Sequence, residues 1–225
     1  MAAAPWSSLF AHDRPALIGV LHLPPLPGSP RWQSDFEAVR RFALADAAAY
    51  LAGGADGLVV ENFGDAPFFA SAVPPHTVAA MARIAAEVVE AAAGIPVGIN
   101  VLRNDAQAAM GIAAASGASF VRVNVLSGAM LTDQGLIEGQ AAELLRLRRQ
   151  LEATEVGIFA DVLVKHAYPL APQPIAEAVE DCLGRAGADG VIVSGVATGA
   201  APDPEDLAAA SWPKSSFCSW QWGHQ

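Results

Sequence analysis

The run Gly54-Ala55-Asp56-Gly57 leads directly into the apolar segment Leu58-Val59-Val60-Glu61, and this order of glycine turn and strand recurs twice. The later copies are Gly117-Ala118-Ser119-Phe120 and Gly187-Ala188-Asp189-Gly190, each followed by an apolar strand. Glycine suits a helix C-terminus that must enter a left-handed conformation before the chain turns into a strand. The repeat therefore indicates consecutive αβ units.

Short apolar runs alternate with longer helical patterns along the chain, which is typical of βαβ units around a parallel sheet. The six runs are Ala16–His22, Gly57–Glu61, Pro96–Val101, Ser119–Asn124, Val156–Asp161 and Asp189–Ser194. Three amphipathic helices between them space their apolar residues by three or four. These stripes are Phe36, Val39, Ala43, Ala47 and Tyr50; Val78, Met81, Ala85, Val88 and Ala92; and Ile137, Ala141, Leu144, Leu147 and Leu151.

This alternation predicts an α/β fold of the (βα)₈ TIM-barrel type, of which six consecutive βα units are present. The 225 residues suit one domain, and the hydrophobic share of 53% suits strands that are covered on both faces. A doubly wound open sheet is the competing architecture. Its usual G-x-G-x-x-G loop after the first strand is replaced here by His22-Leu23-Pro24-Pro25, so we favour the barrel.

Composition changes after Ala210, where three of the five tryptophans gather with serines in a segment without helical or strand period. We therefore predict an incomplete barrel domain over residues 1–210 and an irregular Trp- and Ser-rich tail over residues 211–225. The tail replaces the last two βα units. A change of reading frame explains both the tail and the missing strands, and a natural extension is the alternative.

Charge and composition exclude several classes of protein. A net charge of −10 and a pI near 4.8 argue against a nucleic-acid surface, although a small anionic ligand fits if a few cations converge. The two cysteines give neither a disulfide framework nor a Cys-based zinc site. No stretch reaches the roughly 18 apolar residues of a membrane span, and Met1–Pro15 does not resemble a signal peptide. We expect a cytoplasmic protein.

Each predicted strand ends in a polar residue on one face, because successive side chains of a strand alternate between faces. Active sites of barrels lie at the carboxyl ends of the strands, so these residues are site candidates. Any single one of them can instead cap a helix or anchor a loop. The six residues are His22, Glu61, Asn100, Asn124, Asp161 and Ser194.

The carboxylates of this ring are candidates for acid–base catalysis, since neighbouring carboxylates in a partly dry cavity take different pKa values. We expect Asp161 to act as the base and Glu61, His22 or His166 as the acid. The alternative is a buried hydrogen-bond network of the carboxylates with Asn100 and Asn124, which requires no catalysis.

Arg103, Arg122 and Lys165 lie at or just beyond strand ends, in a chain otherwise poor in positive charge. They can hold a phosphate or carboxylate, or they can simply neutralise the two carboxylates. Ser194 and Gly195 open a glycine-bearing loop whose amides can also cradle an anion. The metal-binding runs His-x-His and His-Glu-x-x-His are absent, so we assign no metal site, and the sequence leaves any cofactor unknown. Magnesium or manganese on the two carboxylates is the less favoured reading.

At these motifs the sequence resembles the BtpA family, also called BtpA/SgcQ, over roughly residues 15–207. The matching segments are Ile18–Gly28, Val60–Phe68, Gly98–Asp105, Val121–Asn124, Thr132–Gly139, Asp161–Ala167 and Val193–Gly199. The resemblance implies a TIM barrel related to phosphate-binding barrels. The family name comes from a cyanobacterial protein needed for photosystem I to accumulate, and other members look like parts of sugar-metabolism gene sets. This chain departs from the family pattern after Leu207.

Two functions follow from the residues and the resemblance together. The first is binding or transformation of a small phosphorylated metabolite by acid–base chemistry in the polar ring. The second, which the resemblance alone implies, is a non-catalytic role in the biogenesis or stability of photosystem I. The sequence leaves open whether the chain is an enzyme, and it is compatible with a homo-oligomer.

Overall fold

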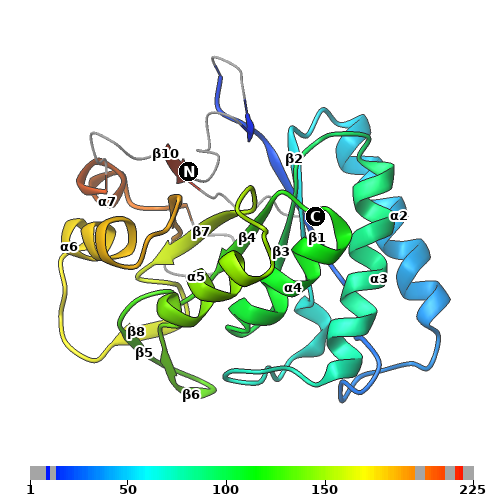
Figure 1. Ribbon diagram of the computed structural model, residues 1–225, viewed down its shortest axis with the longest axis horizontal. Helices are drawn as coiled ribbons and strands as arrows, with labels where there is room; N and C mark the ends of the chain where they lie inside the picture. Colours follow the sequence, from blue (N-terminus) through cyan, green and yellow to red (C-terminus); the bar gives the residue numbers. More distant parts are fainter. Residues whose placement is uncertain (1–8, 11–13, 196–200, 211–215, 220–225) are drawn as a thin grey trace.

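Figure 1 shows a computed structural model of the chain, which describes residues 9–10, 14–195, 201–210 and 216–219. A curled sheet of seven parallel strands forms its centre, a half-barrel in which neighbouring strands hydrogen-bond in register. In spatial order the strands are β1 (Ile18–His22), β2 (Gly57–Glu61), β3 (Val97–Asn100), β4 (Phe120–Val123), β7 (Gly157–Val162), β9 (Gly190–Val193) and β10 (Ser216–Ser219). The sequence predicted the first six of these, with ends that differ by one or two residues.

The helices connect these strands and cover the outer face of the sheet (Figure 1). Leu58, Ile99 and Val121 point outward from their strands into one large core shared with the helices. Their alternate neighbours point inward, as a period of two requires. The helices are α2 (Phe36–Ala52), α3 (Pro75–Ala91), α4 (Ala106–Ser116), α5 (Ala141–Gln150), α6 (Ile175–Glu180), which continues into a π-helical turn (Asp181–Arg185), and α7 (Pro204–Ala209).

The inner face of the curled sheet carries two layers of side chains. The first layer is apolar and contains Val59, Phe120, Phe159 and Ile192, with Phe10 packed against them. The Phe120 and Phe159 rings meet edge to face, with centroids 5.4 Å apart. Two residues further along the same strands stand Glu61, Arg122, Asp161 and Ser194, so a polar layer lies directly on the apolar one.

The repeated glycine turns lock each new strand to the one before it. Gly54, Gly117 and Gly187 have φ values of 83°, 78° and 69°, which confirms the left-handed conformation predicted from the sequence. Two residues after each glycine, a backbone amide donates to a carbonyl at the start of the preceding strand. These bonds are Asp56 N to Leu17 O (2.7 Å), Ser119 N to Val97 O (2.7 Å) and Asp189 N to Ile158 O (2.8 Å).

A second, antiparallel sheet lies over the carboxyl edge of the large one, and the sequence analysis did not predict it. Its strand order is β6 (Gly135–Glu138), β5 (Ala129–Thr132) and β8 (Ala167–Pro169). Ile137 lies in β6, so its assignment to a helical stripe was wrong and the helix begins at Ala141. Leu131 pairs with Leu136 on one side and Tyr168 on the other, and all three are at least half exposed.

The tail also differs from the prediction of an irregular segment. Ser216–Ser219 form β10, which pairs in parallel with β9 from Ser216 opposite Gly190 to Ser219 opposite Val193. Residues 211–215 and 220–225 lie outside the described residues. The division into a barrel domain and a tail therefore stays a prediction. None of the helices in the described ranges has the length and hydropathy needed to span a bilayer.

The inner apolar layer requires glycine at position 98 of β3. A Cβ added there would stand 2.1 Å from a carbon of the Phe120 ring, which is itself packed on Phe159. We therefore expect Gly98→Ala to lower the free energy of unfolding by about 1–3 kcal/mol through overpacking. Urea denaturation measures this change.

Gly111→Ala is the matched control, because a Cβ at this position of helix α4 meets nothing within 4 Å. It removes the helix penalty of glycine and should raise stability by about 0.5–1 kcal/mol. If Gly98→Ala is neutral or stabilising, the inner layer is not packed as described.

Candidate functional site

A buried ion pair between β4 and β7 organises the polar layer. Arg122 donates from Nε and Nη2 to the two carboxylate oxygens of Asp161, at 2.9 Å and 3.0 Å. Asn124 donates a third hydrogen bond to Asp161, at 2.9 Å. Arg122 is 2% exposed and Asp161 4% exposed, so this bidentate pair is shielded from water.

Glu61 lies on the other side of Arg122. The Asn100 amide donates to one Glu61 oxygen at 2.6 Å, and Arg122 Nη1 lies 3.6 Å from the same oxygen. His22 approaches the other oxygen to 3.7 Å through Nε2, and its ring stacks on Phe63 with centroids 4.4 Å apart. Burial lowers the pKa of His22, against the opposing effect of the Glu61 charge. Arg122 therefore stands between two carboxylates.

Arg103 and Lys165 bring two further cations to the same place. Arg103 Nη2 donates to the backbone carbonyl of Lys165 at 2.8 Å, which ties the loop after β3 to the loop after β7. Leu163 and His166 flank Lys165 with φ values of 49° and 57°, a region that residues other than glycine seldom adopt. The loop that carries Lys165 is thus held in an uncommon backbone conformation, as is frequent at ligand sites.

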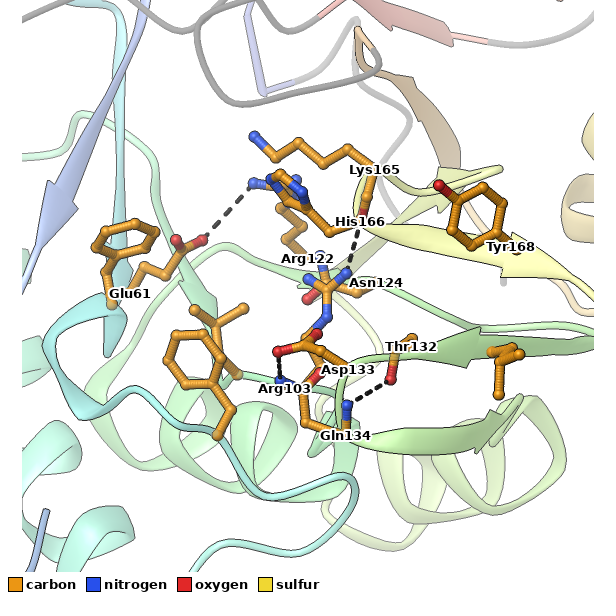
Figure 2. Close-up of a pocket in the computed structure, with 14 residues that line it drawn as sticks. Glu61, Arg103, Arg122, Asn124, Thr132, Asp133, Gln134, Lys165, His166 and Tyr168 are labelled. Carbon is orange, nitrogen blue, oxygen red and sulfur yellow. Dashed lines mark hydrogen bonds and ion pairs between the residues drawn. The ribbon is translucent and has the colours of Figure 1, made fainter. Parts of the chain in front are cut away.

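A pocket of about 630 Å³ opens above this polar layer (Figure 2). The floor of the pocket, next to the strand ends, is polar. Glu61 and Arg122 form an ion pair there, and Arg103 donates a hydrogen bond to the Lys165 backbone. Its walls are largely apolar and come from outside the strand ends. The wall residues are Phe63, Phe68, Leu102, Leu131 and Tyr168, and the β5–β6 hairpin adds Thr132, Asp133 and Gln134.

The structure brings most of the residues predicted from the sequence to this place. Those that line the pocket are Glu61, Arg103, Arg122, Asn124, Lys165 and His166. Asn100, Asp161 and His22 do not line it, and they contact Glu61 or Arg122 from outside. Ser194 and Gly195 are not on the lining either, and Ser194 Oγ has no hydrogen-bond partner among the described residues. Residues 196–200 of their loop lie outside the described ranges.

The hairpin residues and the aromatic walls are what sequence reasoning missed. The hairpin turns at Asp133 and Gln134, and Gly135 follows with a φ of 98°. A turn of this composition between two short apolar runs is a hairpin signal, and it could have been found in the sequence. Tyr168 and Phe68 carry no such signal, because they lie outside any stretch with a helical or strand period.

Comparison with known proteins identifies the family. The sequence profile of the BtpA family matches residues 13–215. The chain belongs to the BtpA family. The photosystem I biogenesis protein BtpA of Synechocystis is 54% identical over 195 residues, which are 87% of this chain and 67% of that protein. An uncharacterized protein of Pyrococcus furiosus is 47% identical over 86% of this chain and 72% of its own length.

Solved structures resemble this BtpA-family chain more distantly. An L-ribulose 3-epimerase aligns with a TM-score of 0.46 at 12% identity, over 80% of this chain and 60% of the epimerase.

The cations of this BtpA-family site differ in how strongly their surroundings perturb them. Burial lowers the pKa of Lys165 to about 8, and the nearby Arg122 adds to this, while Asp161 and Glu61 oppose it. Burial is also the first cause of the lowered pKa of His166, followed by the charges of Lys165 and Arg103. Lys165 therefore changes its charge at a much lower pH than an ordinary lysine does.

The acidic side chains of this site are not grouped as the ligands of a metal ion are, as far as the described residues show. Within the described ranges, no group of three or more His, Cys, Asp or Glu side chains is arranged to hold a metal ion. Glu61 and Asp161 instead lie on opposite sides of the Arg122 guanidinium.

Asp161→Asn tests the buried ion pair. The substitution removes the charge that compensates Arg122, and we expect the free energy of unfolding to fall by about 3 kcal/mol. Urea denaturation followed by circular dichroism measures it. Asp181→Asn is the control, because its Arg185 partner is 86% exposed and the nitrogen–oxygen distance is 3.9 Å. This surface pair should contribute less than about 1 kcal/mol. Equal losses in both variants would contradict the role given to Asp161.

The titration of Lys165 can be measured directly, since Lys165 and Lys214 are the only lysines of the chain. In a Lys214→Arg variant labelled with ¹³C-lysine, the single Cε signal should titrate with a midpoint near pH 8. An ordinary lysine titrates at about 10.4. The sign follows from burial, which disfavours the ammonium form. A midpoint above pH 10 would show that the pocket does not perturb this side chain.

Proposed function

We propose that this chain binds and transforms a small metabolite that carries an anionic group, by acid–base chemistry in the pocket above the polar layer. The observation that carries the proposal is the convergence of the three buried cations Arg103, Arg122 and Lys165 on the lining of one pocket, beside the buried carboxylates of Glu61 and Asp161.

The charges favour an anion. With Lys165 protonated, three cations and two carboxylates are buried here, while a further carboxylate near Arg103, that of Asp133, is exposed to solvent, so the buried groups together carry a net positive charge. Uncompensated buried charge is costly, and an anionic ligand would remove that cost. The third buried carboxylate nearby, Asp105, caps helix α4 and accepts a hydrogen bond from the backbone amide of Val73, so it is committed elsewhere.

The walls of the pocket indicate what else the ligand contains. Phe63, Phe68 and Tyr168 present aromatic surface above the polar floor. Pockets with apolar walls and a few converging polar groups are typical of small-molecule sites. A ligand with an anionic end and a carbon skeleton or ring therefore fits better than a free inorganic ion.

Proton transfer is best assigned to the groups that reach the pocket. Glu61, Lys165 and His166 line it, and the first two are buried beside each other's charges. Both oxygens of Asp161 accept hydrogen bonds from Arg122 and Asn124, so we now assign Asp161 to positioning Arg122. His22 approaches Glu61 from outside the pocket and is assigned to orienting it.

Binding of glycerol 3-phosphate, compared with glycerol, tests the proposal. A ligand at about a hundred times its Kd stabilises a protein by about 2.7 kcal/mol. For a domain of this size such a stabilisation should raise Tm by roughly 5–10 °C. Differential scanning fluorimetry should show this rise with glycerol 3-phosphate and none with glycerol. Absence of any phosphate-dependent rise would contradict the proposal.

Two further measurements test whether Arg103 and Lys165 bind the phosphate group. Arg103→Met should abolish the rise, whereas Arg185→Met, at a residue that is 86% exposed, should preserve it. Affinity for glycerol 3-phosphate should be highest near pH 7 and should fall as the pH passes 8, because Lys165 then loses its charge. Isothermal titration calorimetry between pH 7 and 9 measures this dependence, and an affinity that increases with pH would exclude Lys165 from the anion site.

A non-catalytic role in photosystem I biogenesis is the second candidate, and its support is the 54% identity to the Synechocystis protein of that name. The similar protein of Pyrococcus furiosus favours the metabolite, because an archaeon has no photosystem I. Co-sedimentation of the purified chain with photosynthetic membranes, unaffected by Arg103→Met, would favour the biogenesis role.

A further inference from the structure

The chain contains only two lysines but eleven arginines, and one of the lysines is in the pocket. Arginine makes the ion pairs with Asp56, Glu87, Asp161 and Asp189 elsewhere in the described part of the chain. A positive charge at position 165 could equally come from arginine. Lysine differs because it can lose its proton and become a nucleophilic amine, which arginine cannot do in a protein.

The structure holds this amine in a defined position. Lys165 follows the end of β7 by three residues, its carbonyl accepts a hydrogen bond from Arg103, and the residue is only 8% exposed. Its side chain extends toward Arg122, in the part of the pocket that Glu61 also reaches (Figure 2). His166, the next residue, is exposed by contrast, so the loop turns the Lys165 side chain into the interior and leaves that of His166 at the surface.

The surrounding charges are compatible with an uncharged lysine. When Lys165 is an amine, the buried charges of Arg103 and Arg122 equal in number those of Glu61 and Asp161, and the remaining pocket carboxylate, Asp133, is exposed to solvent. With a pKa of about 8, about a tenth of the side chain is amine at pH 7. Desolvation beside other cations is a recognised means of activating a lysine nucleophile.

We propose that Lys165 forms an iminium (Schiff base) with the carbonyl carbon of a small aldehyde or ketone that carries a phosphate or carboxylate group. The inference rests on the proposed function, because Arg103 and Arg122 hold the anionic group of the same ligand. It narrows the substrate class from an anionic metabolite to an anionic carbonyl compound.

The step balances within the pocket. Glu61 accepts a proton from the Lys165 ammonium, and the amine nitrogen attacks the carbonyl carbon as the oxygen takes up the electron pair of the broken π bond. A second proton then moves from this nitrogen to the oxygen, which becomes a hydroxyl. Glu61 returns its proton to the resulting hydroxyl, which leaves as water while the nitrogen lone pair forms the C=N bond. Ammonium and carbonyl thus give iminium and water, and the positive charge stays on nitrogen between Glu61 and the bound anion.

The iminium activates the bound carbonyl compound for a further reaction. Its positive nitrogen withdraws electrons from the C=N carbon, so that a proton or a carbon substituent on the next carbon can leave while the bonding electron pair stays behind and forms an enamine with the nitrogen. His166 and Glu61 line the same pocket and can move the proton. Enolisation, isomerisation and carbon–carbon bond cleavage are the reactions open to such an intermediate.

Reductive trapping tests the inference. The full chain is incubated at pH 7 with sodium cyanoborohydride and pyruvate, dihydroxyacetone phosphate or glyceraldehyde 3-phosphate, with acetone as the uncharged control. Peptide mapping by mass spectrometry should locate a single adduct on Lys165 for at least one anionic probe. It should form at least about tenfold faster than the adduct on Lys214, because of the larger amine fraction, and at least about tenfold faster than with acetone.

Substitutions at Lys165 and Glu61 distinguish the role of the Lys165 amine as a nucleophile from the role of its positive charge in binding. Lys165→Arg should lose the adduct and keep most of the glycerol 3-phosphate stabilisation, while Glu61→Gln should slow trapping about tenfold or more and leave the adduct on Lys165. Lys214→Arg is the matched control and should trap like the unchanged chain. If Lys165→Arg does not fold, the ratio of Lys165 to Lys214 labelling within the unchanged chain decides the question without a variant.

The outcomes are distinguishable. Stabilisation by glycerol 3-phosphate without preferential trapping at Lys165 by any of the three anionic probes would overturn the iminium and leave the proposed function standing. Absence of both would overturn both. Trapping at Lys165 that is as fast with acetone as with the anionic probes would overturn the claim that the substrate carries an anionic group.

Discussion

The buried pair of Arg122 and Asp161 is the interaction on which the rest of the site depends. It joins β4 to β7 at the level where the apolar interior of the curled sheet ends. Because removing a guanidinium from water is costly, the pair is stable only with both partners in place. Arg122 in turn fixes the environment of Glu61 and of Lys165. One ion pair thus sets the geometry and the electrostatics of the pocket floor.

The parallel sheet could be predicted from the sequence, because its strands are covered on both faces and read as continuous apolar runs between helices. The β5–β6 hairpin could not be separated from helix α5 in this way. Its strands have four residues each, and Ile137 fits both a helical stripe and the buried face of a strand. Strand β10 was harder still to predict. Its sequence, Ser-Phe-Cys-Ser, contains no β-branched aliphatic residue and lies in a segment without a strand period.

The sequence predicts those parts of the site that follow from the alternation of side chains between the two faces of a strand. That alternation places Glu61, Arg122 and Asp161 on one face, and the structure brings them together. This alternation does not show which groups hydrogen-bond to one another. The sequence therefore could not show that both oxygens of Asp161 accept hydrogen bonds from neighbouring side chains. The rarity of lysine was visible in the sequence from the start. Its chemical meaning required the burial and the neighbouring charges that only the folded chain provides.

Part of the pocket wall and the strands that carry its floor belong to separate sheets, and no strand of one pairs with a strand of the other among the described residues. Leu131 and Tyr168 are neighbours on the small antiparallel sheet, whereas the charged groups stand on or next to the parallel strands. Substitutions in the hairpin can therefore change the shape and polarity of this part of the wall without disturbing the ion pairs of the floor. The two parts of the pocket are in this sense free to change independently.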